Sequence, residues 1–198
     1  MNQIKFISFF TGHYAWDAEQ LKKSLFKSGV TNYSIDHLQC NGIWETNTQM
    51  KAPFILEKLK ETSSVVWTDA DSRVLRYPEF FDTITTDVGL FFLESDWEIP
   101  KHSIIKNVNS YLQSGTMFFR NTPKVINLLE RWVELNKEDP KQWDQWTLQF
   151  ALQESDVSIT QLPPEYIFIE GSSSPVYENI KPIILHTQAS RRFKSKLR

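Results

Sequence analysis

The sequence predicts an α/β fold in which a mostly parallel, mixed sheet is flanked by helices. Short apolar runs of strand length alternate along the chain with segments whose apolar residues recur at helical spacing. This alternation is typical of a sheet covered by helices on both faces, and ligands then bind outside the carboxyl ends of the strands. The residues that follow each apolar run are therefore the first candidates for a functional site.

The first half of the chain predicts a strand–helix–strand–helix–strand order. Its apolar runs of strand length lie at residues 4–10, 33–38 and 65–67. After the first run, Asp17 resembles a helix N-cap with Gln20 three residues further on, and Gly29 suits the position beyond the helix end. Pro53 suits the first turn of the second helix.

The second half is less regular. Further strands are predicted at residues 88–93, at a run ending with 117–119, and at 182–185. Thr122-Pro123 is typical of a helix start, and a last helix is expected from about Asp144 to Gln153.

The composition predicts a globular protein with one domain over residues 1–198. Hydrophobic residues make up 40% of the chain and charged residues 23%, which is ordinary for a folded domain of this length. Cys40 is the single cysteine, which excludes an internal disulfide and favours a reducing, cytoplasmic location. No run of about 18 apolar residues is present, so we expect no membrane span.

The charge is unevenly distributed. The formal net charge is −2, yet the last eight residues carry five basic side chains and no acid. The remaining acidic body lacks the basic face that nucleic-acid binding requires, so no nucleic-acid partner is expected. The basic tail is either a solvated terminus, a phosphate-binding element through Arg191, Arg192 or Lys194, or the source of at most weak peripheral membrane contact.

Two acids and a histidine follow predicted strands. Asp69 and Asp71 come directly after the run 65–67, and a period-two backbone would place both side chains on one side. His186 follows the run that ends at Leu185. These residues are either a solvated acidic turn and a structural histidine, or oxygen and imidazole ligands suited to Mn²⁺ or Mg²⁺.

Three other segments are candidates for ligand contact. Thr11-Gly12-His13-Tyr14 follows the first strand, so we expect it to lie near the acids and His186. Ser114-Gly115 within a strand indicates either a bulge or the close approach of a ligand or another backbone. In Trp143-Asp144-Gln145-Trp146, the residues either cap and pack a helix, or bind sugar hydroxyls while a tryptophan stacks on a sugar face.

Five segments in this order resemble the GT-A-fold nucleotide-diphospho-sugar transferases, which are metal-dependent glycosyltransferases with an Asp-x-Asp motif. The resemblance covers about residues 4–194. The segments are Lys51-Ala52-Pro53-Phe54-Ile55-Leu56, Val65-Val66-Trp67-Thr68-Asp69-Ala70-Asp71, Ser114-Gly115-Thr116-Met117-Phe118-Phe119-Arg120-Asn121, Asp144-Gln145 and Leu185-His186.

The resemblance implies a role for each candidate residue. Asp69, Asp71 and His186 would hold Mn²⁺ or Mg²⁺, and Asp144 with Gln145 would face the sugar or the acceptor. The nucleotide-sugar donor, by family likeness a UDP-sugar, would be bound by Thr11, Gly12, Tyr14, Lys51, Asp69, Ser114, Gly115, Arg191 and Lys194. The acceptor would be a glycan, lipid or protein hydroxyl.

The charges suggest how such an enzyme, a hexosyltransferase-like glycosyltransferase, would work. The barrier falls when a cation and basic residues neutralise the departing diphosphate, while the sugar carbon becomes oxocarbenium-like. Inversion needs a carboxylate base, for which Asp144 is the candidate, whereas retention lets the leaving phosphate help to take the proton. The branch of the family that the chain resembles favours retention.

Two alternatives remain at this stage. A haloacid-dehalogenase-type phosphatase also uses Asp-x-Asp after a strand, but such enzymes carry Thr or Val where this chain has Arg73, and their motif follows the first strand. A non-catalytic sugar-nucleotide-binding protein on the same fold is the other, because a fold does not by itself guarantee activity.

Overall fold

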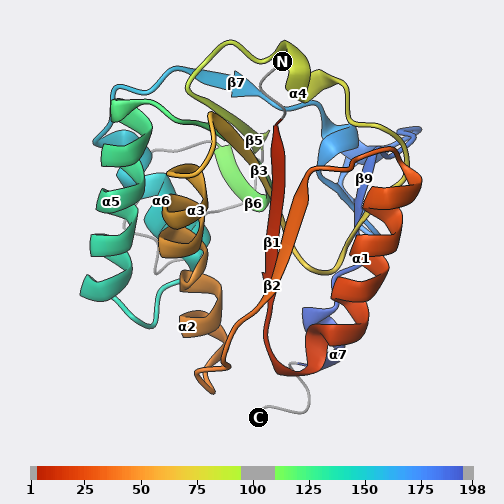
Figure 1. Cartoon of the computed structure of the whole chain (residues 1–198), viewed down its shortest axis with the longest axis horizontal. Helices are drawn as coiled ribbons and strands as arrows, with labels where there is room; N and C mark the ends of the chain where they lie inside the picture. The colour runs from red at the N-terminus through yellow and green to blue at the C-terminus, as the bar shows by residue number, and fades with distance from the viewer. Residues whose placement is uncertain (1–3, 95–109, 194–198) are drawn as a thin grey trace.

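The computed structural model describes residues 4–94 and 110–193, which fold around a six-stranded mixed sheet (Figure 1). The strand order in this sheet is β2-β1-β3-β6-β5-β7. Its strands are β1 (Lys5–Phe10), β2 (Tyr33–His37), β3 (Ser64–Thr68), β5 (Val88–Glu94), β6 (Ser110–Arg120) and β7 (Ile159–Gln161). A smaller sheet has the order β4-β9-β8, with β4 (Ser72–Val74), β8 (Phe168–Ile169) and β9 (Ile184–His186).

The sheet is parallel in its first half and mixed in its second. β1 pairs in parallel with both β2 and β3, as the strand–helix–strand pattern predicts. β6 runs antiparallel to both β3 and β5, and β7 is parallel to β5. In the small sheet β9 is antiparallel to β4 and parallel to β8. The predicted mostly parallel, mixed sheet is confirmed.

Helices cover the two faces of the large sheet. In Figure 1, α2 (Trp44–Gln49), α3 (Lys51–Leu59), α5 (Pro123–Glu138) and α6 (Asp144–Gln153) lie on one side, and α1 (Ala15–Lys27) lies on the other. Two short helices, α4 (Phe80–Thr83) and α7 (Ser190–Phe193), and three 3₁₀ turns, η1 (Gly12–Tyr14), η2 (Pro164–Tyr166) and η3 (Pro175–Tyr177), complete the described elements.

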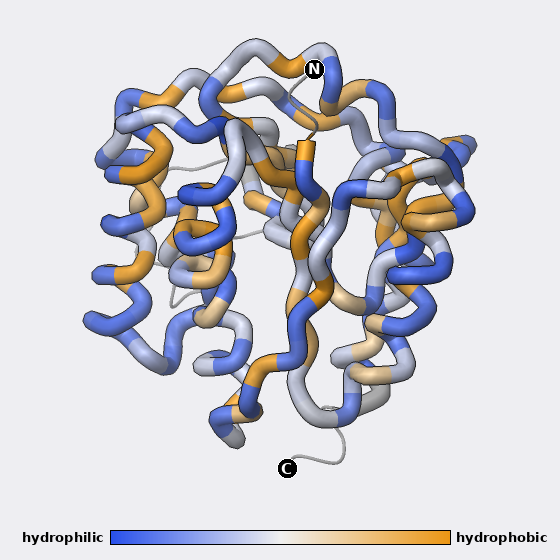
Figure 2. Tube along the Cα trace, in the orientation of Figure 1, coloured by the Kyte–Doolittle hydropathy of each residue, from blue (hydrophilic) through white to orange (hydrophobic). Residues whose placement is uncertain are grey.

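Alternating side chains of the strands build a core on each face of the sheet. Ile7 and Val65 pack with α3, α5 and α6, whereas their neighbours Phe6 and Val66 pack with α1 and the small sheet. Such alternation follows from the period-two geometry of a strand. Figure 2 shows the corresponding hydrophobic stretches in the central strands and hydrophilic residues on the outer helix faces. Within the described residues, no helix is both long and apolar enough to cross a membrane.

Most predicted helix boundaries agree with the structure, including the start of the last helix at Asp144, but the N-cap predicted at Asp17 was wrong. Thr122 caps α5 through its side chain, which accepts from the backbone N–H of Val125, and Gly29 adopts a positive φ after α1. Asp17, however, lies inside the first turn of α1, because the 3₁₀ turn η1 already starts the chain toward the helix. Asp144 is the first residue of α6, and Trp143 occupies the cap position.

Asp17 instead forms a buried ion pair. Its Oδ1 lies 3.3 Å from Nη2 of Arg73 in β4, and its backbone carbonyl accepts a second hydrogen bond from Nη1 at 3.2 Å. The Asp17 side chain is 2% exposed. The pair therefore joins α1 to the small sheet that carries β9, a contact that the local capping pattern did not predict.

Removing one partner of this pair is expected to destabilise the fold. Asp17→Ala leaves the guanidinium of Arg73 without its carboxylate in a largely buried place, so the free energy of unfolding should fall by about 3 kcal/mol. Glu19→Ala, on the same helix, breaks only the exposed Glu19–Lys23 pair and should leave stability nearly unchanged. Urea denaturation of both variants measures the difference, and equal midpoints would contradict the structural role of the pair.

Candidate active site

A cleft of about 670 Å³ lies at the carboxyl end of β1 and β3. Its walls come from the starts of α2, α3 and α6, the N-terminal half of β6 and the segment around β9. In Figure 1 the carboxyl end of β1 is its lower end, toward α2 and α7. The predicted site residues that line it are Thr11, Gly12, Tyr14, Lys51, Asp69, Asp71, Ser114, Gly115, Asp144, Gln145 and His186. The expectation that residues after separate strands meet in one place is confirmed.

Asp69 and Asp71 reach the cleft from a turn and not from a strand. β3 ends at Thr68, and the N–H of Ser72 donates to the carbonyl of Asp69 at 2.9 Å, which closes a turn between β3 and β4. The period-two argument for the two side chains was therefore wrong. The turn is held against β6, because the N–H of Asp69 donates to the carbonyl of Gly115 at 2.9 Å.

His186 reaches the acids through the small sheet. It is the last residue of β9 and pairs with Ser72 of the antiparallel β4, directly after the acidic turn. One ligand atom from each of Asp69, Asp71 and His186 lies within 4.8 Å of the others. The C-terminal segment also contacts this cluster, because the N–H of Ala189 donates to Oδ2 of Asp71 at 2.7 Å.

The imidazole of His186 is buried between two hydroxyl groups. Its Nε2 lies 2.9 Å from Oγ1 of Thr116 and its Nδ1 lies 3.3 Å from Oγ of Ser72. Burial lowers the pKa of His186, and this effect outweighs the opposing carboxylates of Asp69 and Asp71. The ring is therefore neutral at physiological pH, which is the protonation state that a metal ligand requires.

Gly115 leaves the space that this ring occupies. A Cβ atom built on Gly115 would lie 2.8 Å from Cε1 and 3.0 Å from Nδ1 of His186. Any side chain at this position would displace the imidazole, since contacts below about 3 Å lie inside van der Waals separation. The neighbour of this glycine is thus a side chain and not a ligand or another backbone, and the pairing of β6 with β5 shifts register in this stretch, as the bulge alternative predicts.

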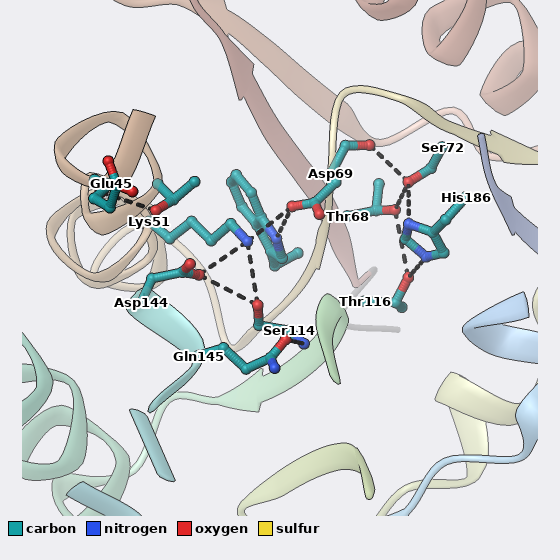
Figure 3. A network of polar contacts seen from close by, with 12 residues as sticks. Glu45, Lys51, Thr68, Asp69, Ser72, Ser114, Thr116, Asp144, Gln145 and His186 are labelled. Carbon is teal, nitrogen blue, oxygen red and sulfur yellow. Dashed lines mark hydrogen bonds and ion pairs between the residues drawn. The ribbon is translucent and has the colours of Figure 1, made fainter. Parts of the chain in front are cut away.

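A buried lysine joins the acidic turn to α6 (Figure 3). Nζ of Lys51 lies 3.0 Å from Oδ1 of Asp69 and 3.0 Å from Oδ2 of Asp144, and it donates to Oγ of Ser114 at 3.3 Å. Ser114 in turn donates to Asp144 at 3.2 Å, and Gln145 Oε1 accepts from the N–H of Ser114 at 3.3 Å. The side chains of Lys51 and Asp144 are 7% and 5% exposed.

These contacts fix the charge of the lysine. Burial alone would lower the pKa of Lys51, but the carboxylates of Asp144 and Asp69 outweigh burial and raise it. Lys51 therefore carries a positive charge at physiological pH. Its ammonium group also lies 5.6 Å from the ring centroid of Trp67, whose indole N–H donates to Oδ1 of Asp69 at 3.2 Å.

Tyr14 lines the same cleft as the two acids. Burial and the negative charges of Asp71 and Asp69 raise the pKa of Tyr14 to about 12, against an opposing hydrogen bond from the Trp44 side chain. The phenol is therefore protonated at physiological pH and offers both a donor and an acceptor to a ligand.

The cluster of Asp69, Asp71 and His186 fits a divalent cation. Two carboxylates and a neutral imidazole form a ligand set that suits Mn²⁺, and oxygen ligands suit Mg²⁺. A ligating histidine normally donates its other ring N–H to an oxygen, and the hydroxyls of Ser72 and Thr116 offer such oxygens. Gly115 contributes to this arrangement, because its lack of a side chain leaves room for the imidazole.

A family model identifies the sequence. The model described as nucleotide-diphospho-sugar transferase matches residues 25–198. The chain belongs to the nucleotide-diphospho-sugar transferase family. It is thus a glycosyltransferase by family, and the Asp-x-Asp turn, His186 and Asp144-Gln145 all fall within the matched range.

Solved glycosyltransferase structures share the fold of this transferase. One involved in the glycosylation of the major capsid of PBCV-1 has a TM-score of 0.70 at 13% identity, with 97% of each chain covered. The galactosyltransferase LgtC, solved with donor and acceptor sugar analogues, has a TM-score of 0.60 at 13% identity, over 98% of this chain and 95% of that chain. GlyE of Streptococcus pneumoniae TIGR4 has a TM-score of 0.64 at 13% identity, over 95% of this chain and 55% of that one.

These structural similarities show a shared GT-A fold, but at 13% identity they do not show a shared substrate. A comparison of the sequence with curated proteins finds no match. The donor and acceptor of this transferase therefore have to be inferred from its own cleft.

One predicted residue is not brought to the cleft, and another is not described. Arg191 is exposed in α7 and does not line it, although Gln188 and Ser190 of the same segment do. Lys194, the other predicted phosphate ligand, lies outside the described residues. Sequence reasoning missed Thr116 and Trp44 as neighbours of the site. Thr116 follows Gly115 directly, so its place beside the site could have been expected.

The lysine bridge can be tested by removing its charge. Lys51→Met leaves Asp69 and the buried Asp144 without their shared cation, so the free energy of unfolding should fall by about 3 kcal/mol. Lys124→Met removes a lysine of the exposed Lys124–Asp156 pair and should leave stability nearly unchanged. Guanidinium denaturation gives both values, and an equally stable Lys51→Met protein would show that the bridge does not hold the site.

The close contact between Gly115 and His186 can be tested by a double-mutant cycle. Gly115→Ala should destabilise the protein by about 1–3 kcal/mol, because the new methyl group overpacks the imidazole. In a His186→Ala background the same substitution should cost clearly less, since the clashing ring is gone. Denaturation midpoints of the four proteins give the coupling, and an additive cycle would contradict the steric argument.

Proposed function

We propose that this transferase moves a sugar from a nucleotide-diphosphate donor, specifically a UDP-sugar, to an acceptor hydroxyl with the help of Mn²⁺. The observation that carries the proposal is the convergence of Asp69, Asp71 and His186 within 4.8 Å, in the same cleft as the buried Lys51–Asp144 pair. The choice of UDP rests on the family resemblance, and Mg²⁺ is the alternative cation.

The charge of the cleft supports a divalent cation and an anionic donor. Among the described residues that line the cleft, Asp69, Asp71 and Asp144 are acidic and Lys51 is the one lysine or arginine, while His186 is neutral. This excess of negative charge suits a divalent cation, which supplies the positive charge that stabilises a departing diphosphate.

The remaining residues of the cleft would bind and orient the donor. Thr11, Gly12 and the protonated Tyr14 face the nucleotide in this proposal, with Tyr14 as a hydrogen-bonding group. Ser114, Gly115 and Gln145 face the sugar. Lys51 adds a fixed positive charge near the phosphates and costs no reorganisation, because its ammonium is already held by two carboxylates.

The role of Asp144 favours retention of the anomeric configuration. Inversion requires a carboxylate that takes the acceptor proton, yet Oδ2 of Asp144 already accepts from both Lys51 and Ser114 and the side chain is 5% exposed. We therefore propose that Asp144 positions the sugar. The acceptor oxygen forms the new bond to the sugar carbon, the bond to the phosphate oxygen breaks, and the acceptor proton passes to the released phosphate.

The two alternatives differ in support. The family match does not support a phosphatase with Asp69 as nucleophile. In addition, Oδ1 of Asp69 is already bound by Lys51 and by the indole N–H of Trp67. A sugar-nucleotide-binding protein without turnover would use the same cleft. Activity separates it from a transferase.

Ligand-induced stabilisation tests the proposed site. UDP with Mn²⁺ should raise the Tm of the full chain by several degrees, since a ligand that binds only the folded state stabilises it. Asp71→Asn should abolish this gain, because the amide replaces a charged ligand of the cation, and it should abolish transfer or hydrolysis of a UDP-sugar as well. Differential scanning fluorimetry and a UDP-release assay measure the two effects.

Three outcomes would count against the proposal. An equal Tm gain in wild type and Asp71→Asn would contradict cation binding by Asp71. Stabilisation without turnover over a panel of donors and acceptors would favour the binding protein. Phosphate release from a simple phosphoester, with no dependence on nucleotide, would favour the phosphatase.

A further inference from the structure

Two tryptophans line the cleft beside Asp144. Trp44 is the first residue of α2 and Trp143 directly precedes α6, and their ring centroids lie 5.9 Å apart at an interplanar angle of 81°. Both contribute to the wall of the cleft, and Trp143 is 40% exposed. The cleft thus presents a large apolar ring next to a carboxylate and an amide.

Hydrogen bonds around α2 and α6 hold this pair in place. Nε2 of the buried Gln49 donates to the carbonyls of Asp139 and Gln142, at 3.0 Å and 2.8 Å, and Nδ2 of Asn136 donates to the carbonyl of Gln49 at 3.2 Å. The carbonyl of Trp143 accepts from the N–H of Trp146 at 3.0 Å. These bonds join the segment that carries Trp143 to the helix that begins with Trp44, so the two rings are pre-positioned.

The neighbouring tryptophans have different environments. Trp146 packs edge-on against Tyr111, with 5.5 Å between centroids, and does not line the cleft. Trp132 is fully buried and donates to the carbonyl of Asp144 at 2.9 Å. Core packing accounts for these two side chains, whereas the ring of Trp143 packs edge-on against Trp44 and is 40% exposed at the cleft.

Trp143 lines the cleft directly before Asp144, and the side chain of Trp44 forms a hydrogen bond with Tyr14. In Figure 3, Glu45 of α2 and Asp144 of α6 lie on one side of Lys51, and His186 lies on the other. Trp44 and Trp143 are the chain neighbours of Glu45 and Asp144. A donor whose diphosphate sits at Asp69, Asp71 and His186 would therefore direct its sugar toward Asp144, which Trp143 directly precedes.

We propose that Trp143, supported by Trp44, is the acceptor subsite and stacks on the apolar face of a pyranose ring. Flat aromatic rings beside a few fixed polar groups suit a ligand with one apolar face and hydroxyls at its edge. The acceptor is therefore a glycan, and not a protein side chain or a lipid alcohol. This inference rests on the proposed transfer reaction and names the second substrate of the same site.

Binding of simple glycosides tests the subsite without knowledge of the donor sugar. Methyl β-D-galactopyranoside and methyl β-D-glucopyranoside are titrated into the full chain with UDP and Mn²⁺, and saturation-transfer NMR reports the bound sugar. Trp143→Ala should weaken binding of the preferred glycoside about tenfold. Trp143→Phe keeps a flat ring and should retain most of the affinity. Phe26→Ala removes an aromatic ring that is 73% exposed on α1 and should change nothing.

Kinetics give the second readout. With a UDP-sugar that supports transfer, Trp143→Ala should raise the acceptor KM about tenfold while kcat changes little, because stacking holds ground state and transition state alike. Unchanged glycoside affinity in Trp143→Ala, an equal rise in the donor KM, or transfer to a serine peptide or a fatty alcohol but to no pyranoside would each overturn the inference. A wild-type protein that UDP and Mn²⁺ fail to stabilise would instead overturn the proposed function itself.

Discussion

The shared ion pairs of Lys51 are the interaction on which the geometry of the cleft depends. One ammonium group lies 3.0 Å from the carboxylates of both Asp69 and Asp144, which come from positions far apart in the chain. Two acids this close to one another would repel, and a buried carboxylate without a partner is strongly destabilising. The lysine therefore holds the end of β3 and the start of α6 at a fixed separation, and a donor sugar is proposed to bind in the space between them.

Buried charges are stable only when they have hydrogen-bonding partners, and the polar side chains of the cleft supply these partners. Ser114 contacts both Lys51 and Asp144, and Trp67 donates to Asp69, so the buried charges have further hydrogen-bonding partners. Asp71 is bound instead by the backbone of the C-terminal segment through Ala189. The two acids of the Asp-x-Asp turn are thus held by different parts of the fold. The cation cluster forms where these parts meet.

Local sequence patterns predicted the strands, most helices and the residues at the ends of β1 and β3, because hydrophobic periodicity and chain direction act over short distances. They did not reveal the ion pairs of Asp17 and Asp144. Both acids precede apolar helical segments and look like caps, yet each pairs with a basic residue distant in sequence, Arg73 or Lys51. A tertiary ion pair can override a local preference, and nothing within a few residues of either acid reveals its partner.

The antiparallel strand β6 is the part of the site that a parallel-sheet interpretation would not provide. Thr116 pairs with Thr68, the last residue of β3, and β6 extends beyond that point to Ser110. Its overhanging half carries Ser114 and Gly115 into the cleft from within a strand. A purely parallel sheet offers only strand ends to a ligand. Here one strand that runs in the opposite direction supplies rigid backbone along the cleft, and it places Gly115 where His186 needs room beside Asp69 and Asp71.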